Sequence, residues 1–178
     1  MVSTAMNIHN KQTINAPIEQ VWKLVAEDFA NAYKWMSGVV HSYEINHGLK
    51  GETPVAGRVC NLENHEKPFH AVENILRFDE TSHTLVFEVI PVKERGPKLP
   101  VVKNKVTIEL TATSEGQTIV YWHSNVTLKL IGKLLYPILK LGLYKAFSDI
   151  LQDLKAYIET GNPSKRKVSS DKKLLAAT

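Results

Sequence analysis

Apolar and polar residues alternate over most of the first 128 positions of the chain, which is the two-residue period of β-strands. The first such segment is 7–16. Later segments with this alternation are 39–46, 57–65, 69–78, 84–91, 101–113 and 118–128. The stretches between them are short and contain Gly, Pro, Asp and Ser, which are common in turns. Because parallel neighbours need long crossover connections, these segments are predicted to form an antiparallel meander.

Two short helices are predicted between the first and the second strand. Pro17 suits the first position of a helix, where its missing N–H has no partner to lose. The apolar residues between Val21 and Val25 then recur at helical spacing. The segment 29–36 has the pattern of a second short helix.

A long helix is predicted at the end of the patterned region, from about 131 to 160. Its apolar residues recur every three or four positions and form one broad stripe. The stripe consists of Leu135, Leu139, Leu143, Ala146, Phe147, Ile150, Leu154 and Ile158. Pro137 is expected either to kink the start of this helix or to mark where its regular part begins.

Together these elements predict an α+β fold, in which a curved seven-stranded antiparallel sheet wraps around a long C-terminal helix. The sheet has one face to bury, and the long helix offers the largest apolar surface that can cover it. A sheet that curls around one helix also leaves room between the two. We therefore expect a concave, mostly apolar ligand cavity there.

The charge of the chain is concentrated at one end. Its 178 residues include 22 Lys and Arg against 18 Asp and Glu, a net charge of +4. All of this excess lies in 161–178, whereas 1–160 carries equal numbers of basic and acidic side chains. We therefore predict one folded domain at 1–160, no nucleic-acid partner, and a basic, disordered tail at 161–178. The alternative for the tail is attraction to anionic lipid or nucleic acid.

Neither secretion nor insertion into a membrane is indicated. A single cysteine forms no internal disulfide, and the first residues lack the pattern of a signal peptide, so we expect a cytoplasmic protein. Lysines interrupt the apolar segment 130–147, which is too short to span a bilayer. Because Lys129, Lys133, Lys140 and Lys145 flank apolar residues, weak peripheral contact with a membrane is the alternative interpretation.

Motifs for nucleotide binding and for nucleophilic catalysis are missing from the sequence. It contains no Gly-x-Gly-x-x-Gly segment, no Gly-Lys-Ser/Thr loop and no Gly-x-Ser-x-Gly turn, so no cofactor is predicted. His65 and His70 flank a predicted turn, and Cys60 precedes them. Their spacing matches no established zinc motif, so no metal site is predicted, and Cys60 is expected to be an inert packed residue.

Several segments resemble the START/Bet v 1-like (SRPBCC) superfamily, and its polyketide cyclase/dehydrase and lipid-transport branch is the best match. The phrase Ile14-Asn-Ala-Pro-Ile-Glu-Gln-Val-Trp22 is similar to the opening of these proteins. Trp35 stands where they often carry a tryptophan, and Glu73-Asn-Ile-Leu-Arg-Phe-Asp79 is similar to their fourth strand. The run 132–155 resembles their final helix. The resemblance covers 4–160 and implies the helix-grip fold and a hydrophobic ligand.

Candidate ligand-binding residues follow from the apolar pattern and from this resemblance. They are Trp35, Glu73, Phe87, Val89, Val106, Ile108, His123, Leu139, Leu143, Phe147 and Ile150. Hydropathy alone places Glu73 on the outer face of the sheet, while the resemblance places it in the cavity. Trp122 and His123 are adjacent, so only one of them can point inward. An inward Glu73 and an inward His123 would form an acid/base pair, or would orient the polar end of a ligand.

The function predicted first is binding, and carriage, of a hydrophobic small molecule such as a lipid or a polyketide-like compound. The alternative is an enzyme of the cyclase/dehydratase kind that uses acid/base residues of the cavity. A third interpretation is a carrier that contacts a membrane through the lysines of the helix and tail. The loop 92–100 is expected to gate the cavity, with Lys93, Arg95 and Lys98 available to an anionic head group, or to be an ordinary solvated connection.

Overall fold

The computed structural model describes residues 5–47, 53–62, 69–93, 96 and 99–176. The strands are β1 (Ala5–Ile14), β2 (His41–Ile45), β3 (Gly57–Asn61), β4 (Phe69–Asp79), β5 (Thr84–Lys93), β6 (Val101–Ala112) and β7 (Thr118–Leu128). They form one antiparallel sheet with the order β1-β7-β6-β5-β4-β3-β2. The predicted meander is therefore confirmed, and its first strand closes against its last.

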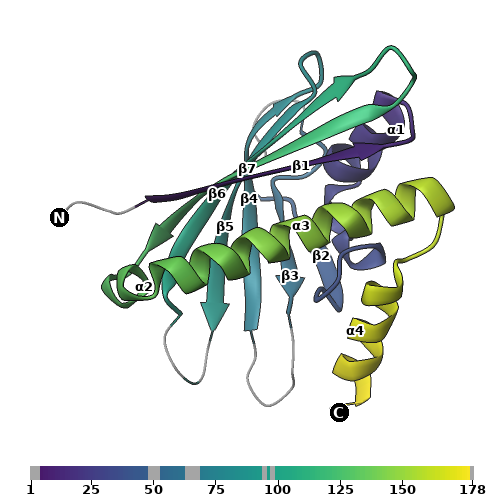
Figure 1. Cartoon of the computed structure of the whole chain (residues 1–178). Coiled ribbons are helices and arrows are strands. Elements are labelled where there is room, and N and C mark those ends of the chain that lie inside the picture. The colour runs from purple at the N-terminus through teal and green to yellow at the C-terminus, as the bar shows by residue number, and fades with distance from the viewer. Residues whose placement is uncertain (1–4, 48–52, 63–68, 94–95, 97–98, 177–178) are drawn as a thin grey trace.

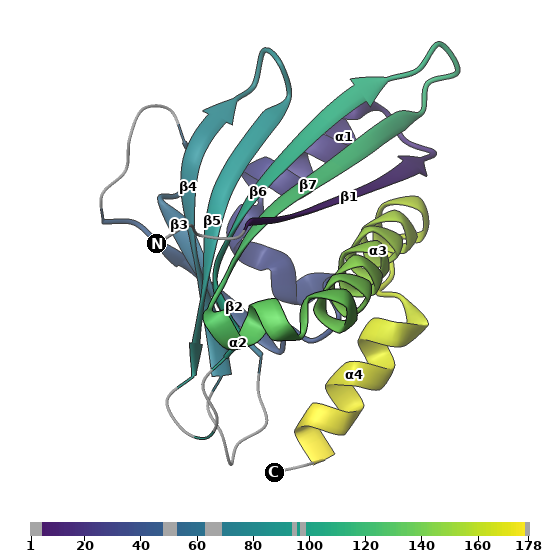
Figure 2. The same cartoon turned by 60° about the vertical axis from the view of Figure 1, so that its left-hand side comes forward.

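Helices occupy the ends of the sheet and its concave side (Figure 1). The helical elements are α1 (Ile18–Trp22), a π-helical turn (Lys23–Glu27), a 3-10 helix (Phe29–Lys34), α2 (Leu130–Leu134), α3 (Tyr136–Thr160) and α4 (Lys165–Ala176). The long helix α3 crosses the concave face of the sheet, and both views show the strands curving around it (Figures 1 and 2). This arrangement confirms the predicted helix-grip architecture. In the described part of the chain, no helix combines the length and apolarity needed to cross a membrane.

The predicted long helix is divided in two near its start. The backbone of Leu135 leaves the helical conformation, with φ −95° and ψ 13°. Pro137 lies in the first turn of α3, where its missing N–H breaks no helical hydrogen bond. Pro137 therefore marks the beginning of the regular helix, which is the second of the two predicted possibilities.

The tail is the element that the sequence analysis predicted wrongly. Residues Lys165–Ala176 form α4 rather than a disordered extension, and α4 packs beside the end of α3 (Figure 2). The Ser164 hydroxyl accepts a hydrogen bond from the Lys167 N–H, which caps the start of the helix. The Nζ of Lys167 is buried and donates to the carbonyl of Val39 over 2.8 Å. A basic residue of the expected solvated tail is thus part of the packed interior.

Two apolar clusters fill the space between the sheet and the helices. The larger one joins the short helices, the sheet and the C-terminal half of α3, where Leu151 and Leu154 are fully buried. The smaller one consists of Met6, Ile8, Val126 and Leu128, with Leu139 and Leu143 partly buried above it. No residue of the first half of α3 is fully buried. That half of the helix therefore covers the sheet more loosely than the second half.

Candidate ligand-binding pocket

An apolar pocket of about 220 Å³ lies under the loosely packed half of α3. Strands β4 to β7 form its floor, α3 forms its roof, and Leu99 and Pro100 lie at its side. Its lining residues are Leu62, Phe69, Ala71, Val89, Pro91, Leu99, Pro100, Val101, Asn104, Val126, Leu143 and Phe147. The pocket is slightly smaller than most sites for drug-sized ligands, so it suits a compact ring system or a short chain as it stands.

Six of the candidate residues line two neighbouring spaces. Val89, Leu143 and Phe147 line the pocket. Trp35, Phe87 and Ile108 line a deeper void of only about 10 Å³, which holds at most about one water molecule. Phe147 of the pocket stacks on Trp122 of the void, with their ring centroids 5.8 Å apart. The linings of the two spaces therefore meet at this ring contact.

Three candidates contribute packing rather than lining. Val106 is fully buried in the larger cluster, and Ile150 packs against the same cluster. Leu139 packs on the smaller cluster. The apolar periodicity identifies residues that lie between the helix and the sheet. It does not distinguish residues that line a pocket from residues of the filled core, because both lie on this face.

Glu73 points into the interior, as the resemblance implied and contrary to its hydropathic pattern. Its side chain is 9% exposed, and its Oε2 lies 2.7 Å from Nη2 and 2.8 Å from Nε of Arg58. The pattern misled because a β-bulge between Ile75 and Arg77 shifts the register of β4. Up to the bulge Ala71 and Glu73 face inward, while beyond it Phe78 packs against the buried Trp22 instead. A single alternation across the whole strand therefore gives the wrong face for Glu73.

Arg58 is a residue of the site that the sequence analysis missed. Its Nη1 donates to the carbonyl oxygen of Phe29 over 2.6 Å, and its guanidinium lies 4.0 Å from the centroid of the Phe29 ring. Arg58 also lines the deep void. The signal was present as opposite charges on neighbouring strands, since Arg58 and Glu73 are directly paired. It becomes readable only when the β3–β4 register is known.

His123 lies on the outer face of the sheet, so it does not line the predicted cavity between the sheet and the long helix. Its neighbour Trp122 takes the inward position and is 5% exposed. The Nε2 of His123 lies 3.8 Å from Oε2 of Glu109, and its Nδ1 lies 2.6 Å from Nδ1 of His9 on β1. The structure therefore does not bring His123 and Glu73 together, and the predicted acid/base pair is not formed.

Asn104 is a second missed residue and the polar member of the pocket lining. It is 7% exposed, and its Nδ2 donates to the hydroxyl of Ser124 over 3.2 Å. The same hydroxyl accepts a hydrogen bond of 2.9 Å from Nε1 of Trp122. Among the described residues, Asn104 is the only polar side chain that lines the pocket, and its buried Oδ1 has no partner. The signal was available, because Asn104 shares the inward face of β6 with Val106 and Ile108.

Cys60 is buried, as predicted, and chemically inert. It is 1% exposed, and burial raises the pKa of its thiol to about 12. A thiol with this pKa carries almost no thiolate at neutral pH, and the thiolate is the nucleophile and the metal ligand. Within the described ranges, no group of three His, Cys, Asp or Glu side chains is arranged to hold a metal ion. His65 lies outside the described residues.

The expected gate is described only in part. Leu99 and Pro100 line the pocket, and Lys93 is the half-buried last residue of β5. Arg95 and Lys98 lie outside the described residues. Of the described residues of this segment, Leu99 and Pro100 therefore belong to the wall of the pocket.

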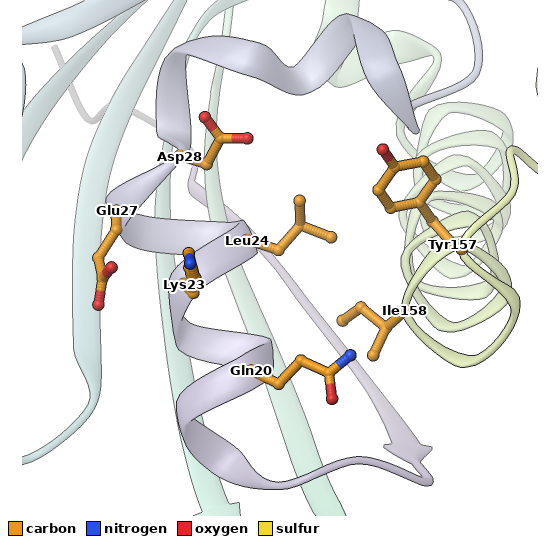
Figure 3. A pocket seen from close by; sticks show the side chains of 8 residues that line it. Gln20, Lys23, Leu24, Glu27, Asp28, Tyr157 and Ile158 are labelled. Carbon is orange, nitrogen blue, oxygen red and sulfur yellow. The ribbon is translucent and has the colours of Figure 1, made fainter.

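A separate hollow of about 560 Å³ opens between the short helices and the end of α3 (Figure 3). Leu24 faces Tyr157 and Ile158 across it, while the charged side chains of Lys23, Glu27 and Asp28 lie around the short helices. Its lining mixes charged and apolar side chains, unlike the apolar space under α3. It is therefore a cleft between helices and not the predicted cavity between sheet and helix.

Comparison with known proteins places the whole domain in one group. The sequence profile of the family described as polyketide cyclase/dehydrase and lipid transport matches residues 5–159. A comparison with curated protein sequences finds no match.

Solved structures with the same fold have very different sequences. A START superfamily protein from Mycobacterium smegmatis is 12% identical and superposes with a TM-score of 0.68, covering 89% of this chain and 100% of that one. The protein TTHA0849 from Thermus thermophilus is 16% identical with a TM-score of 0.66, covering 88% and 99%. Ara h 8.0201 is 12% identical with a TM-score of 0.66, also covering 88% and 99%. At these identities the likeness extends to the fold alone.

Proposed function

Because the chain belongs to the polyketide cyclase/dehydrase and lipid transport family, we propose that it binds and carries a hydrophobic small molecule in the pocket under α3. The observation that carries this proposal is the lining of that pocket, which is apolar apart from Asn104 among the described residues. A site of this composition selects ligands by burying their apolar surface, at about 25 cal/mol for each Å² removed from water. The ligand class that fits is lipid-like or polyketide-like. We also propose that the protein is cytoplasmic.

The polar part of the ligand is proposed from Asn104. An unpartnered buried amide oxygen costs free energy until it receives a hydrogen bond. A ligand with one hydroxyl group on an otherwise apolar body would supply this bond to Oδ1 and place the rest of its surface against Val89, Leu143 and Phe147. We therefore propose a compact hydroxylated ligand rather than a pure hydrocarbon.

Binding is favoured over catalysis by the surroundings of the ionisable groups. The cyclase/dehydratase alternative relied on Glu73 and His123, and His123 lies on the outer face. Glu73 is held by Arg58 and is committed to an ion pair. A carboxylate in this position orients and stabilises, whereas a general base needs access to the proton that it removes.

The test is ligand retention by the gently purified protein, read by native mass spectrometry and followed by solvent extraction. We expect extra mass that is released by organic solvent. The variant Leu143→Trp fills the pocket from the roof and should lose this mass, together with the binding of an apolar fluorescent probe. The matched control is Ala146→Trp, because Ala146 is exposed on the same helix. Equal probe binding by both variants would overturn the assignment of the pocket.

A further inference from the structure

The first part of the C-terminal helical region carries an unusual amount of exposed apolar surface. On α2, Leu130 is 76% and Leu134 is 81% exposed, and on α3, Ile138 is 73% and Leu141 is 72% exposed. Ile131 and Tyr144 add to the same surface, at 58% and 51%. We call these six residues the α2–α3 apolar surface. Single exposed leucines are ordinary, but a cluster of this kind marks an interaction site.

The charged residues of the segment that carries the α2–α3 apolar surface all have one sign. Lys129, Lys133, Lys140 and Lys145 lie among or beside its residues, and the segment 129–148 contains no acidic residue. The Nζ of Lys145 lies 2.6 Å from Oδ2 of Asp149, one turn further along α3, so part of its charge is compensated within the helix. Exposed large apolar side chains with lysines alongside are the composition of helices that lie in the surface of an anionic bilayer.

This surface borders the ligand pocket. The backbone N–H of Lys129 donates to the carbonyl of Pro100 over 2.9 Å, and Pro100 lines the pocket. Gly132 of α2 packs directly on Pro100 as well. On the other side, Leu143 of α3 lines the pocket within one turn of Leu141 and Tyr144. Both views place α2 where β7 ends and α3 begins (Figures 1 and 2).

We propose that the α2–α3 apolar surface docks on an anionic membrane surface and brings the pocket under α3 to the lipid. In this arrangement the exposed leucines and isoleucines enter the boundary between head groups and acyl chains, and the lysines lie against lipid phosphates. The proposal rests on the proposed function, because a carrier of a hydrophobic molecule needs a place to collect or deliver it. It adds that this place is an anionic lipid surface.

A second copy of the chain fits the same surface less well. A two-fold contact through this surface would bring each lysine near the lysines of the partner copy, because the same patch lies on both sides. With no acidic residue in 129–148, such a contact has no opposite charge from this segment to compensate them. An anionic bilayer satisfies both the apolar and the basic part of the surface.

The experiment is co-sedimentation with vesicles of phosphatidylcholine alone and of phosphatidylcholine mixed with phosphatidylglycerol. We expect the full chain to bind the mixed vesicles at least tenfold more tightly than the neutral ones, and to bind them more weakly at high salt. The double variant Leu134→Glu/Ile138→Glu should lose at least tenfold in binding to the mixed vesicles. Leu76→Glu is the matched control, since Leu76 is 55% exposed on β4, outside this surface.

Several outcomes would overturn the proposal. One is equal sedimentation of the Leu134→Glu/Ile138→Glu variant and the Leu76→Glu control, provided that both keep the thermal unfolding midpoint of the parent. Failure of the parent chain to bind either type of vesicle is another. A third is a parent chain that binds no vesicles but forms a concentration-dependent dimer, while the double variant stays monomeric. This result would assign the surface to a second copy instead.

The two proposals fail in different ways. Leu143→Trp should sediment with mixed vesicles like the parent chain while losing the apolar probe. The Leu134→Glu/Ile138→Glu variant should bind the probe in solution like the parent while losing the vesicles. Vesicle binding by a parent chain that takes up no probe would therefore overturn the pocket and leave the docking surface standing.

Discussion

At the scale of single residues, polar side chains inside the sheet distinguish this interior from a plain apolar core. Arg58, Glu73, Asn104 and Ser124 are all buried. Arg58 and Glu73 satisfy each other, and Ser124 accepts two hydrogen bonds. Asn104 keeps one atom unpaired beside the pocket. We assign Arg58 and Glu73 to the stability of the fold and Asn104 to the binding of the ligand.

Replacing Asn104 should separate hydroxylated from purely apolar ligands. In Asn104→Leu, a bound short-chain alcohol loses one hydrogen bond of about 1 kcal/mol, which is a loss in affinity of about fivefold. The matching alkane should bind no more weakly than it does to the parent chain. Displacement of an apolar fluorescent probe by the alcohol and by the alkane measures both. Equal changes for the two ligands would remove Asn104 from the proposed binding site.

Breaking the buried ion pair should cost more than removing it. Glu73→Ala leaves the guanidinium of Arg58 buried without its carboxylate, which should lower the free energy of unfolding by about 3–5 kcal/mol. The double variant Arg58→Met/Glu73→Leu removes both charges and should recover much of this loss, because an apolar pair of similar size replaces them. Urea unfolding at a constant slope measures both. If the double variant were less stable than Glu73→Ala, the ion pair would stabilise the fold by more than the compensation of its two charges.

The residue scale also shows where prediction from the sequence succeeds. Alternation placed Phe87 and Ile108 inward correctly, because β5 and β6 pair without a register shift over those positions. It failed for Glu73, because the bulge in β4 changes the period locally and leaves no mark that hydropathy can detect. Asn104 lies on the inward face of β6, and alternation predicted the inward face of that strand correctly. It was missed because a polar residue there contradicts the expectation of an apolar wall.

At the scale of elements, α4 depends on one buried carboxylate. Asp153 of α3 is fully buried and accepts hydrogen bonds from the Ser37 N–H, the Ser164 hydroxyl and Nη1 of Arg166. It therefore joins α3, α4 and the segment that follows the 3-10 helix. The composition of 161–178 suggested disorder, because charged residues are usually solvated. The partners that order this segment lie far from it in the sequence, so composition could not reveal them.

Asp153→Ala should release α4. Three donors would lose a buried acceptor, and we expect the free energy of unfolding to fall by about 2–3 kcal/mol or more. Backbone amides of Lys165–Ala176 should exchange faster with deuterated solvent and lose more protection than those of β6 and β7, whose protection falls only with the overall stability. Lys172→Ala is the control, since Lys172 is exposed. Unchanged exchange in α4 would show that Lys167 and its contact with Val39 suffice to hold it.

At the scale of the whole molecule, the two halves of α3 have different tasks. The second half is buried against the sheet and the short helices and stabilises the fold. The first half covers the pocket on one side and presents exposed apolar residues on the other. The sequence predicted a single stripe along the helix, because periodicity shows which face is apolar but not how closely it packs. The seven-stranded sheet and its partner helix were predictable for the same reason, since both depend on periodicity alone.

The contact between α2 and Pro100 connects the sheet, the pocket and the docking surface, and Gly132 makes it possible. A Cβ at position 132 would lie 2.7 Å from the backbone oxygen of Pro100, so α2 must move away in Gly132→Ala. We expect a loss in stability of about 1–3 kcal/mol. Because Pro100 lines the pocket, a bound apolar probe should also dissociate faster.

Gly142→Ala is the matched control for this change. Position 142 lies on α3 with no atom within 4 Å of an added Cβ, so alanine should stabilise the helix by up to about 1 kcal/mol and leave the probe unaffected. Thermal unfolding and stopped-flow dissociation of the probe compare the two variants. Should both variants gain stability and release the probe at the parent rate, α2 would not hold the mouth of the pocket, and the membrane-docking surface and the pocket would act independently. Faster release of the probe by Gly132→Ala alone would instead support a role for α2 in holding Pro100 in the wall of the pocket.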